Sequence, residues 1–220
     1  MDDDATHPAC GRTTALACAL VPVPLSDRVV LENTHVRLEP LSIDHVDELA
    51  TALAEGGLEH TWYTSVPTPE TVADDVANRL ALHAAGLMNP WAVRRASDGA
   101  LVGCTTYCNI AQADRHVEVG HTWLVPSAQR TGVNSAAKLL LFGHAFEACD
   151  AIAVELRTHW HNRQSRAAIE RLGAKLDGVL RNHKIGPDGV LRDTVVYSVL
   201  PHEWPAVRAT LQASLTRHTR

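Results

Sequence analysis

The residues from Gln129 to Ser135 are of types that together bind an anion. They lie between the apolar run VEVGHTWLV and a segment whose apolar residues recur at helical spacing. The first backbone N–H groups of a helix have no partner inside it, and the helix dipole adds partial positive charge there. Gly132 lets a ligand approach the backbone, Asn134 tolerates unusual dihedral angles, Ser135 can cap the helix, and Arg130 can make a bidentate phosphate contact. This junction predicts a site for an anion such as a pyrophosphate.

A second informative run, RTHWHNRQSRAAIERLGAKLDG, begins at residue 157 and places Asn162 and Ser165 at the start of a helical pattern. Together the two runs resemble the GNAT N-acetyltransferases. Gln129-x-x-Gly132-x-Asn134 resembles the family's acetyl-CoA loop, in which Gln or Arg, x, x and Gly are followed by x and then Gly or Ala. Asn134 departs from that last position. The Asn-x-x-Ser run is most similar to the ribosomal-protein N-terminal acetyltransferase branch, and the resemblance covers residues 36–200.

The resemblance implies acetyl-CoA as the acyl-donor co-substrate, an amine as the acceptor, and no metal. The pantetheine end of the donor is expected near Asn162 and Ser165. The other implied donor-binding residues lie on the preceding strand and its loop, and they are Trp123, Leu124, Val125, Gln129, Arg130, Thr131, Gly132, Val133, Asn134 and Ser135.

Acetyl transfer to an amine requires that the amine lose a proton, that the thioester carbonyl be polarised and that the thiolate leave. Glu118 is the leading candidate for the base. It lies in an otherwise apolar strand, and it precedes Gly132 at the spacing that the histone-acetyltransferase branch of the family has. A carboxylate there could accept the proton directly or through water. The alternative is a structural carboxylate that pairs with a residue such as Arg115.

The group that protonates the thiolate is less clear from the sequence. Ile169 stands where many family members have a tyrosine, so that acid is missing. In the ribosomal-protein branch the serine of Asn-x-x-Ser resembles its replacement, which implicates Ser165. Capping of the helix start together with Asn162 is the competing role for this serine. Tyr197 and Tyr107 are the other candidates.

Histidines offer two further hypotheses. The ribosomal-protein branch carries a carboxylate in the strand after the Gly-ended helix, where this chain reads NHK at residues 182–184. The base is therefore either Glu118 or His183, whose imidazole can titrate near neutral pH. His159 and His161 invite a zinc interpretation, but two histidines at i and i+2 without companion cysteines or carboxylates are a weak signal, and no metal is predicted.

Composition limits the classes of protein. With 220 residues, of which 45% are hydrophobic, the chain fits one domain with a sizeable core. A net charge of −5 gives no basic patch for nucleic acid and no polybasic membrane signal. Five cysteines at irregular spacing indicate neither a disulfide framework nor a zinc ribbon, and Cys104 and Cys108 are expected to be small buried side chains.

Residues 1–24 are expected to form a flexible tail and residues 25–220 the domain. The apolar run TALACALV follows acidic residues, whereas a secretory signal would begin with positive charge. No stretch reaches the roughly 20 apolar residues that span a bilayer. These features predict a cytoplasmic protein without a membrane or nucleic-acid partner, and they leave a homodimer open.

Strands and helices are expected to alternate around these residues. Period-2 patterns predict strands over residues 29–41, 91–95, 101–108, 116–124, 152–157, 175–185 and 190–200. Helical spacing predicts helices over residues 44–53, 68–85, 133–149, 161–172 and 202–215. Hairpins mixed with strand-helix-strand crossovers predict a single α/β (α+β) domain. Its family resemblance implies a mixed, mostly antiparallel sheet flanked by helices.

The predicted function is acyl-CoA-dependent transfer of acetyl to a primary amine by direct attack. A catalytically silent acyl-CoA-binding or sensing module is the main alternative, favoured by the missing tyrosine and opposed by Glu118. A structural domain that binds no CoA would require both motifs to arise by chance. The acceptor is a protein N-terminus, a small-molecule amine or hydrazine, or an amino sugar, and the aromatic loop from His60 to Val66 could line its cleft.

Overall fold

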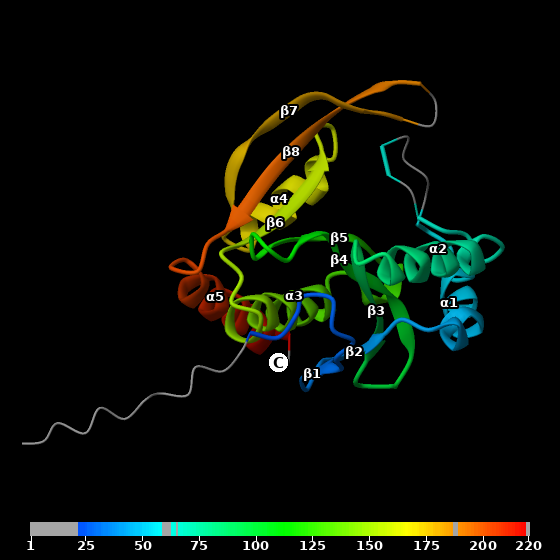
Figure 1. Ribbon diagram of the computed structural model, residues 1–220. Coiled ribbons are helices and arrows are strands. Elements are labelled where there is room, and N and C mark those ends of the chain that lie inside the picture. The colour runs from blue at the N-terminus through cyan, green and yellow to red at the C-terminus, as the bar shows by residue number, and fades with distance from the viewer. Residues whose placement is uncertain (1–21, 59–62, 65, 187–188, 219–220) are drawn as a thin grey trace, which may run out of the picture.

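One eight-stranded sheet runs through the computed structural model, which describes residues 22–58, 63–64, 66–186 and 189–218 (Figure 1). The strand order is β1-β2-β3-β4-β5-β6-β8-β7, and among these strands only β5 and β6 pair in parallel. In chain order the strands are β1 (Leu31–Glu32), β2 (Val36–Pro40), β3 (Met88–Arg95), β4 (Leu101–Ala111), β5 (His116–Leu124), β6 (Ala153–His159), β7 (Lys175–Ile185) and β8 (Leu191–Val199). The predicted mixed, mostly antiparallel sheet is confirmed.

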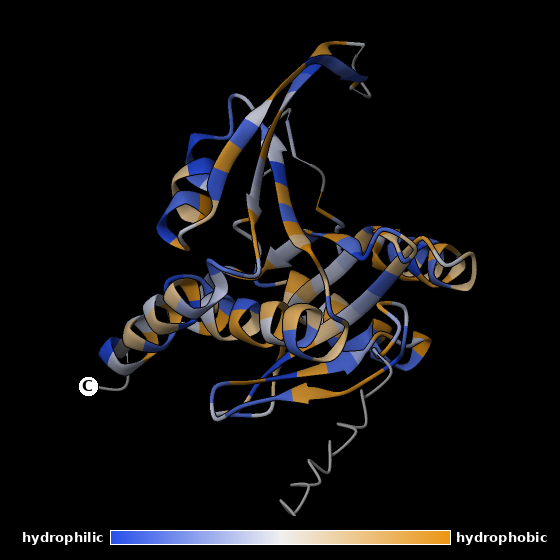
Figure 2. Cartoon of the chain, turned by 60° about the vertical axis from the view of Figure 1, so that its left-hand side comes forward, coloured by the Kyte–Doolittle hydropathy of each residue, from blue (hydrophilic) through white to orange (hydrophobic). Residues whose placement is uncertain are grey.

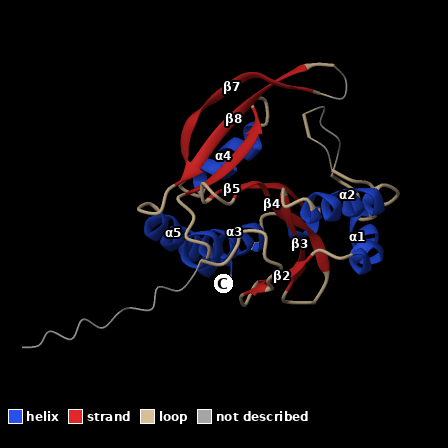
Figure 3. Cartoon of the chain, in the orientation of Figure 1, coloured by secondary structure: helices blue, strands red, loops and turns tan. Residues whose placement is uncertain are grey.

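Helices cover both faces of the sheet (Figures 1 and 3). They are α1 (Val46–Leu53), α2 (Val72–Ala84), α3 (Val133–Gly143), α4 (Arg163–Arg171) and α5 (Trp204–His218). Thr106 and Tyr107 are neighbours on β4, so their side chains point to opposite faces. Thr106 contacts Arg79 of α2, whereas Tyr107 donates its hydroxyl to the carbonyl of Leu141 on α3. The helices α1 and α2 therefore lie on one face, and α3 with α5 lies on the other.

Large aromatic side chains fill the core on the α3 side of the sheet. Trp91 and Tyr107 are fully buried and meet edge to face with ring centroids 5.0 Å apart, a geometry that aromatic pairs favour. Phe142 of α3 meets Trp204 of α5 in the same way at 6.2 Å. Burying side chains of this size stabilises the fold by roughly 1.5–3 kcal/mol each. This face therefore holds β4 firmly against α3.

The β7–β8 hairpin projects beyond the rest of the sheet (Figures 1 and 2). Figure 2 shows polar and apolar residues alternating along it, as expected for strands with two different faces. β7 forms the sheet edge and is largely exposed. Residues 187–188 lie outside the described residues, but the N–H of Gly189 donates to the carbonyl of Gly186 at 2.9 Å, which is the bond of the predicted turn.

Several predicted elements have other bounds in the structure. The strand expected over residues 29–41 is two strands, because Asn33 Oδ1 accepts from the N–H groups of His35 and Val36 and folds the chain into a turn. The strand expected to begin at Trp91 begins at Met88. The helix expected to reach residue 149 leaves α-geometry at Gly143 and continues as a π-turn over residues 144–148.

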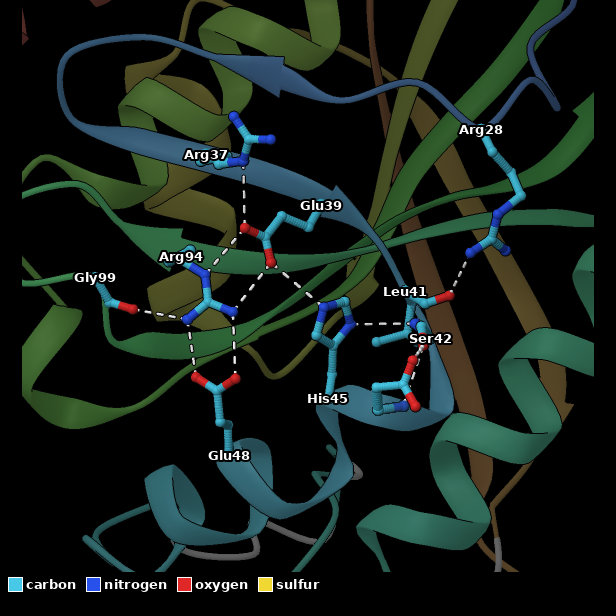
Figure 4. Close-up of polar contacts among 10 residues, drawn as sticks. Arg28, Arg37, Glu39, Leu41, Ser42, His45, Glu48, Arg94 and Gly99 are labelled. Carbon is cyan, nitrogen blue, oxygen red and sulfur yellow. Dashed lines mark hydrogen bonds and ion pairs between the residues drawn. The ribbon is translucent and has the colours of Figure 1, made fainter.

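A network of charged groups ties β2 and β3 to α1 (Figure 4). Arg94 donates from Nε to Glu39 Oε1 at 3.0 Å and from Nη2 to Glu39 Oε2 at 3.1 Å. The same guanidinium bonds Glu48 at 2.8 Å, and His45 Nε2 lies 3.3 Å from Glu39. The hydrogen bond from Arg94 lowers the pKa of Glu39. This carboxylate is therefore fully committed to its partners.

The N-terminal boundary is a prediction that the structure does not test, since residues 1–21 lie outside the described residues. The first described residues already pack against the domain. Val23 donates its N–H to the carbonyl of Ala148 at 2.9 Å, and Leu25 is fully buried. Within the described residues, none of the helices combines the length and the apolar character that crossing a membrane requires.

Candidate active site

The central feature of the site is the divergence of β5 from β6. The two strands pair at three positions only, of which Glu118 opposite Glu155 is the last. β5 then continues to Leu124 and β6 to His159 without further pairing between them, and Figure 1 shows β6 turning away. Backbone groups past the last pair are released from the sheet on that side. A ligand can therefore meet the backbone of β5 there, next to Glu118.

Glu118 is 7% exposed and has two partners. Asn109 donates from Nδ2 to Oε2 at 2.6 Å, and Arg157 Nε lies 3.6 Å from the same oxygen. Arg157 bonds Glu155 more closely, at 2.7 Å. The suggested partner Arg115 is wrong, because this residue follows a turn and forms its ion pair with Asp150 instead.

A bulge in β5 follows Glu118. The register between β4 and β5 shifts so that β5 has one extra residue, and His121 adopts a positive φ of 47°. Arg79 of α2 reaches the bulge and donates to the carbonyl of His121 at 3.2 Å and to Thr106 Oγ1 at 2.8 Å. Asp75 neutralises this buried guanidinium at 2.7 Å. α2 thereby fixes the shape of β5 where it leaves β6.

The other face of the bulge holds a buried lysine. Lys138 of α3 is 4% exposed and donates from Nζ to Thr122 Oγ1 at 3.1 Å, and Thr122 also contacts Thr105 Oγ1 at 2.8 Å. Burial lowers the pKa of Lys138 to about 8. Our sequence analysis missed Lys138 and Arg79. The signal for Lys138 was present, since it stands between buried Ala137 and Leu141 in a helix that faces the core.

The predicted anion loop is formed at the start of α3. Gly132 is the N-cap residue with φ 90°, a left-handed conformation that glycine adopts without strain. Gln129 Nε2 donates to the carbonyl of Leu124, and Thr131 Oγ1 to that of Ala128. No described residue accepts a hydrogen bond from the backbone N–H groups of residues 130–135. These N–H groups have the arrangement that an anion requires, and anion binding itself stays a prediction.

One detail of the loop differs from the prediction. Ser135 lies in the first turn of α3 and provides no cap; the cap residue is Gly132, and it makes no side-chain hydrogen bond. The side chains of residues 123–125 are buried, at 8% exposure or less. Only their backbone can therefore meet a donor.

Asn162 and Ser165 have different roles at the start of α4. Asn162 is the N-cap, and its Oδ1 accepts from the backbone N–H of Ser165 at 3.0 Å. The cap therefore uses the amide of Ser165 and leaves its half-buried hydroxyl unbound among the described residues. Ile169 is buried at 6% exposure, so the family's tyrosine position is occupied by a core residue.

Both candidate tyrosines already have partners. Tyr107 is fully buried under α3 and donates to the carbonyl of Leu141. Tyr197 is 1% exposed, donates to Glu170 Oε1 at 2.8 Å and accepts from Arg166 Nε at 3.3 Å. Burial raises the pKa of both phenols. Both hydroxyls are therefore engaged in hydrogen bonds within the fold.

The histidines occupy the strands beyond β5. His183 on β7 is half-buried, with Nδ1 3.1 Å from Thr194 Oγ1, and burial together with the charges of Lys184 and Arg157 lowers its pKa. His159 packs 5.6 Å from the ring of Tyr63. Most of the loop from His60 to Val66 lies outside the described residues. In the described part of the chain, no three metal-ligating side chains gather.

Comparisons with known proteins agree with this geometry. A family model for an acetyltransferase (GNAT) domain matches residues 35–175, which include Glu118, the anion loop and the start of α4. YdaF of Bacillus subtilis (strain 168), named as a candidate ribosomal N-acetyltransferase, is 33% identical over 107 residues. That match covers 49% of this chain and 57% of YdaF, so the chain spans little more than half of this relative.

Solved structures share the fold over most of the chain. A GCN5-related N-acetyltransferase from Brucella melitensis is 28% identical, with a TM-score of 0.77 and 89% of each chain covered. RimJ of Mycobacterium smegmatis, solved in complex with CoA-disulfide, is 20% identical, with a TM-score of 0.72 over 89% of this chain and 97% of RimJ. At that identity the likeness to RimJ shows the fold alone.

Proposed function

The chain belongs to the GNAT acetyltransferase family, and from this premise we propose that it transfers acetyl from acetyl-CoA to a primary amine. The acceptor is the N-terminus of a protein or a small-molecule amine. One observation carries the proposal: free backbone donors at the start of α3 lie on the same strand-loop-helix unit as Glu118, at the point where β5 leaves β6.

The donor spans this unit. Its pyrophosphate accepts from the N–H groups of residues 130–135, with Arg130 beside them, and its pantetheine follows the backbone of residues 123–125 toward the last β5–β6 pair. Anion binding at a helix start depends on unpaired N–H groups and on the helix dipole, and both are present at α3. The CoA-disulfide bound to RimJ, which has the same fold, supports this class of ligand.

Glu118 is the proposed base. A neutral amine attacks the thioester carbonyl, and the proton that the amine loses passes to the carboxylate directly or through a water. Asn109 and Arg157 orient one carboxylate oxygen, which leaves the other without a partner among the described residues. His183 is the second candidate, because its lowered pKa favours the neutral imidazole, but its Nδ1 is held by Thr194.

The thiolate of CoA then leaves, and Ser165 is the proposed donor to it. Its hydroxyl is half-buried and takes no part in the cap of α4. The buried Ile169 removes the alternative acid that a tyrosine would supply. Ile169 is also the observation that favours a catalytically silent acyl-CoA-binding module, so turnover has to be measured separately from binding.

Two linked assays test the proposal. Isothermal titration measures acetyl-CoA binding, which we expect in the micromolar range usual for substrates. Release of the CoA thiol is then followed over peptides with different N-terminal residues, polyamines and amino sugars. We expect at least one amine to accelerate release. Binding without acceleration by any amine would favour the silent module, and absence of binding would refute the proposed function.

A further inference from the structure

The side chain of Glu118 lies across the face of Gly120. Residues i and i+2 of a strand share a face. A Cβ atom built on Gly120 would lie 2.8 Å from Glu118 Oε1 and 3.0 Å from Cys108 Sγ, closer than non-bonded atoms approach. Only a residue without a side chain leaves the Glu118 carboxylate where it is.

A bulge in β4 supplies the partner of this carboxylate. Cys108 is opposite Glu118 and Ala111 is opposite His116, so β4 has one extra residue over this interval. Asn109 within it has φ 50°, a left-handed conformation that asparagine tolerates better than most residues. In a regular strand Asn109 would point to the face opposite that of Cys108. The bulge instead brings its Nδ2 to 2.6 Å from Glu118 Oε2.

We propose that Asn109 and Gly120 are positioning residues for Glu118. The amide of Asn109 fixes one carboxylate oxygen, and the bare backbone of Gly120 leaves room for the other. The role rests on the proposed function, in which Glu118 receives the proton of the amine. Arg157 cannot take over the role of Asn109, because its guanidinium lies 3.6 Å from Glu118 and is bonded at 2.7 Å to Glu155.

Asn109→Asp is the sharper test. Aspartate has the same shape and also tolerates positive φ, but it sets a carboxylate where the donor was. We expect kcat with acetyl-CoA and the fastest amine of the panel to fall about 10²-fold, the loss that a misplaced catalytic group causes. KM for acetyl-CoA stays unchanged. Gln212→Glu is the control for charge, because it makes the same amide-to-carboxylate change at an exposed position of α5, and we expect it to keep the wild-type rate.

Gly120→Ala is the second variant. It displaces the far end of the Glu118 side chain rather than backbone, so we expect a folded protein with kcat about 10-fold lower. Both substitutions are then repeated in a Glu118→Gln background. If Asn109 and Gly120 act through Glu118, they cause no further loss there, which is the signature of coupled residues.

The outcomes separate this inference from the proposed function. Equal losses in the wild-type and Glu118→Gln backgrounds, or unchanged kcat in both single variants, would overturn the positioning role and leave Glu118 as the base. A loss in Gln212→Glu equal to that in Asn109→Asp would also overturn the positioning role, because the loss would then be a general effect of charge. If Glu118→Gln alone keeps the wild-type rate, the proposed base and the positioning role are both wrong.

Discussion

Two glutamates on the same sheet, Glu39 on β2 and Glu118 on β5, face arginines in different ways. Arg94 binds both oxygens of Glu39, Arg37 Nε lies 3.3 Å from Oε1, and His45 Nε2 lies 3.3 Å from Oε2 (Figure 4). Glu118 receives one neutral hydrogen bond from Asn109, and its arginine lies 3.6 Å away. The first carboxylate is saturated, and the second is held in place yet keeps an oxygen for a proton.

The difference shows how one fold separates stability from chemistry. Around Glu39 each carboxylate faces an arginine, and these ion pairs are only half-buried. Near the β5 bulge compensation is incomplete, because buried Lys138 has a single hydroxyl partner among the described residues. Incomplete compensation costs stability, and such sites are typically retained where activity needs them.

The largest effect we expect comes from making the same substitution at both glutamates. Glu118→Gln keeps the volume but cannot take a proton, so kcat falls by roughly 10²–10⁴-fold, and the deficit shrinks at high pH as the amine deprotonates unaided. Glu39→Gln leaves kcat unchanged and lowers the free energy of unfolding by about 1–3 kcal/mol. Thiol-release kinetics across pH and urea unfolding measure the two. If the two variants had the same kcat across pH, Glu118 would have no catalytic role that Glu39 lacks.

Gly132→Asp tests the anion loop at the start of α3. It introduces a negative charge beside the proposed pyrophosphate and a side chain at φ 90°, and we expect acetyl-CoA affinity to fall at least about 10-fold, as for a lost charge-assisted contact. Gly189→Asp is the matched control, since Gly189 has φ 80°, open surroundings and a place on the distant β7–β8 turn. Isothermal titration on both variants is the measurement. Unchanged affinity in folded Gly132→Asp would falsify the loop assignment.

Ser165→Ala and Asn162→Ala separate a catalytic role from a structural role at the start of α4. We expect kcat to fall about 10-fold with acetyl-CoA affinity intact, because a donor to the thiolate acts mainly in the transition state. Asn162→Ala removes the cap instead and lowers the free energy of unfolding by about 1 kcal/mol. If Ser165→Ala lowers stability and affinity together at unchanged kcat, the hydroxyl is structural.

The smallest effect concerns acid stability. The pKa of Glu39 is lower in the folded chain, so its ion pairs stabilise the fold above the unfolded-state pKa and are lost as pH falls through the folded-state value. We expect Glu39→Gln to make the stability of the fold less dependent on pH in this range. Unfolding midpoints measured between pH 6 and pH 3 test it. A wild-type slope in the variant would mean that other carboxylates control acid unfolding.

The sequence predicted what depends on near neighbours. The helix that begins at Val133 and the hairpin of β7 and β8 depend on residues close together in the sequence, and both are where the pattern places them. Asn162 caps α4, a role that the sequence analysis left as an alternative. The partners of Glu118 are non-local, so the sequence suggested Arg115, whereas the bulged Asn109 and Arg157 of another strand are the actual contacts. A one-residue bulge leaves no periodic signal, because a single extra residue only shifts the alternation that defines a strand.

The most direct test of the central claim is a crystal structure of the protein with bound CoA. We predict that the pyrophosphate accepts hydrogen bonds from the N–H groups of residues 130–135 and that the pantetheine follows β5 to a thiol between Glu118 and Ser165. A CoA molecule bound elsewhere, or one whose thiol lies away from the divergence of β5 and β6, would contradict the account.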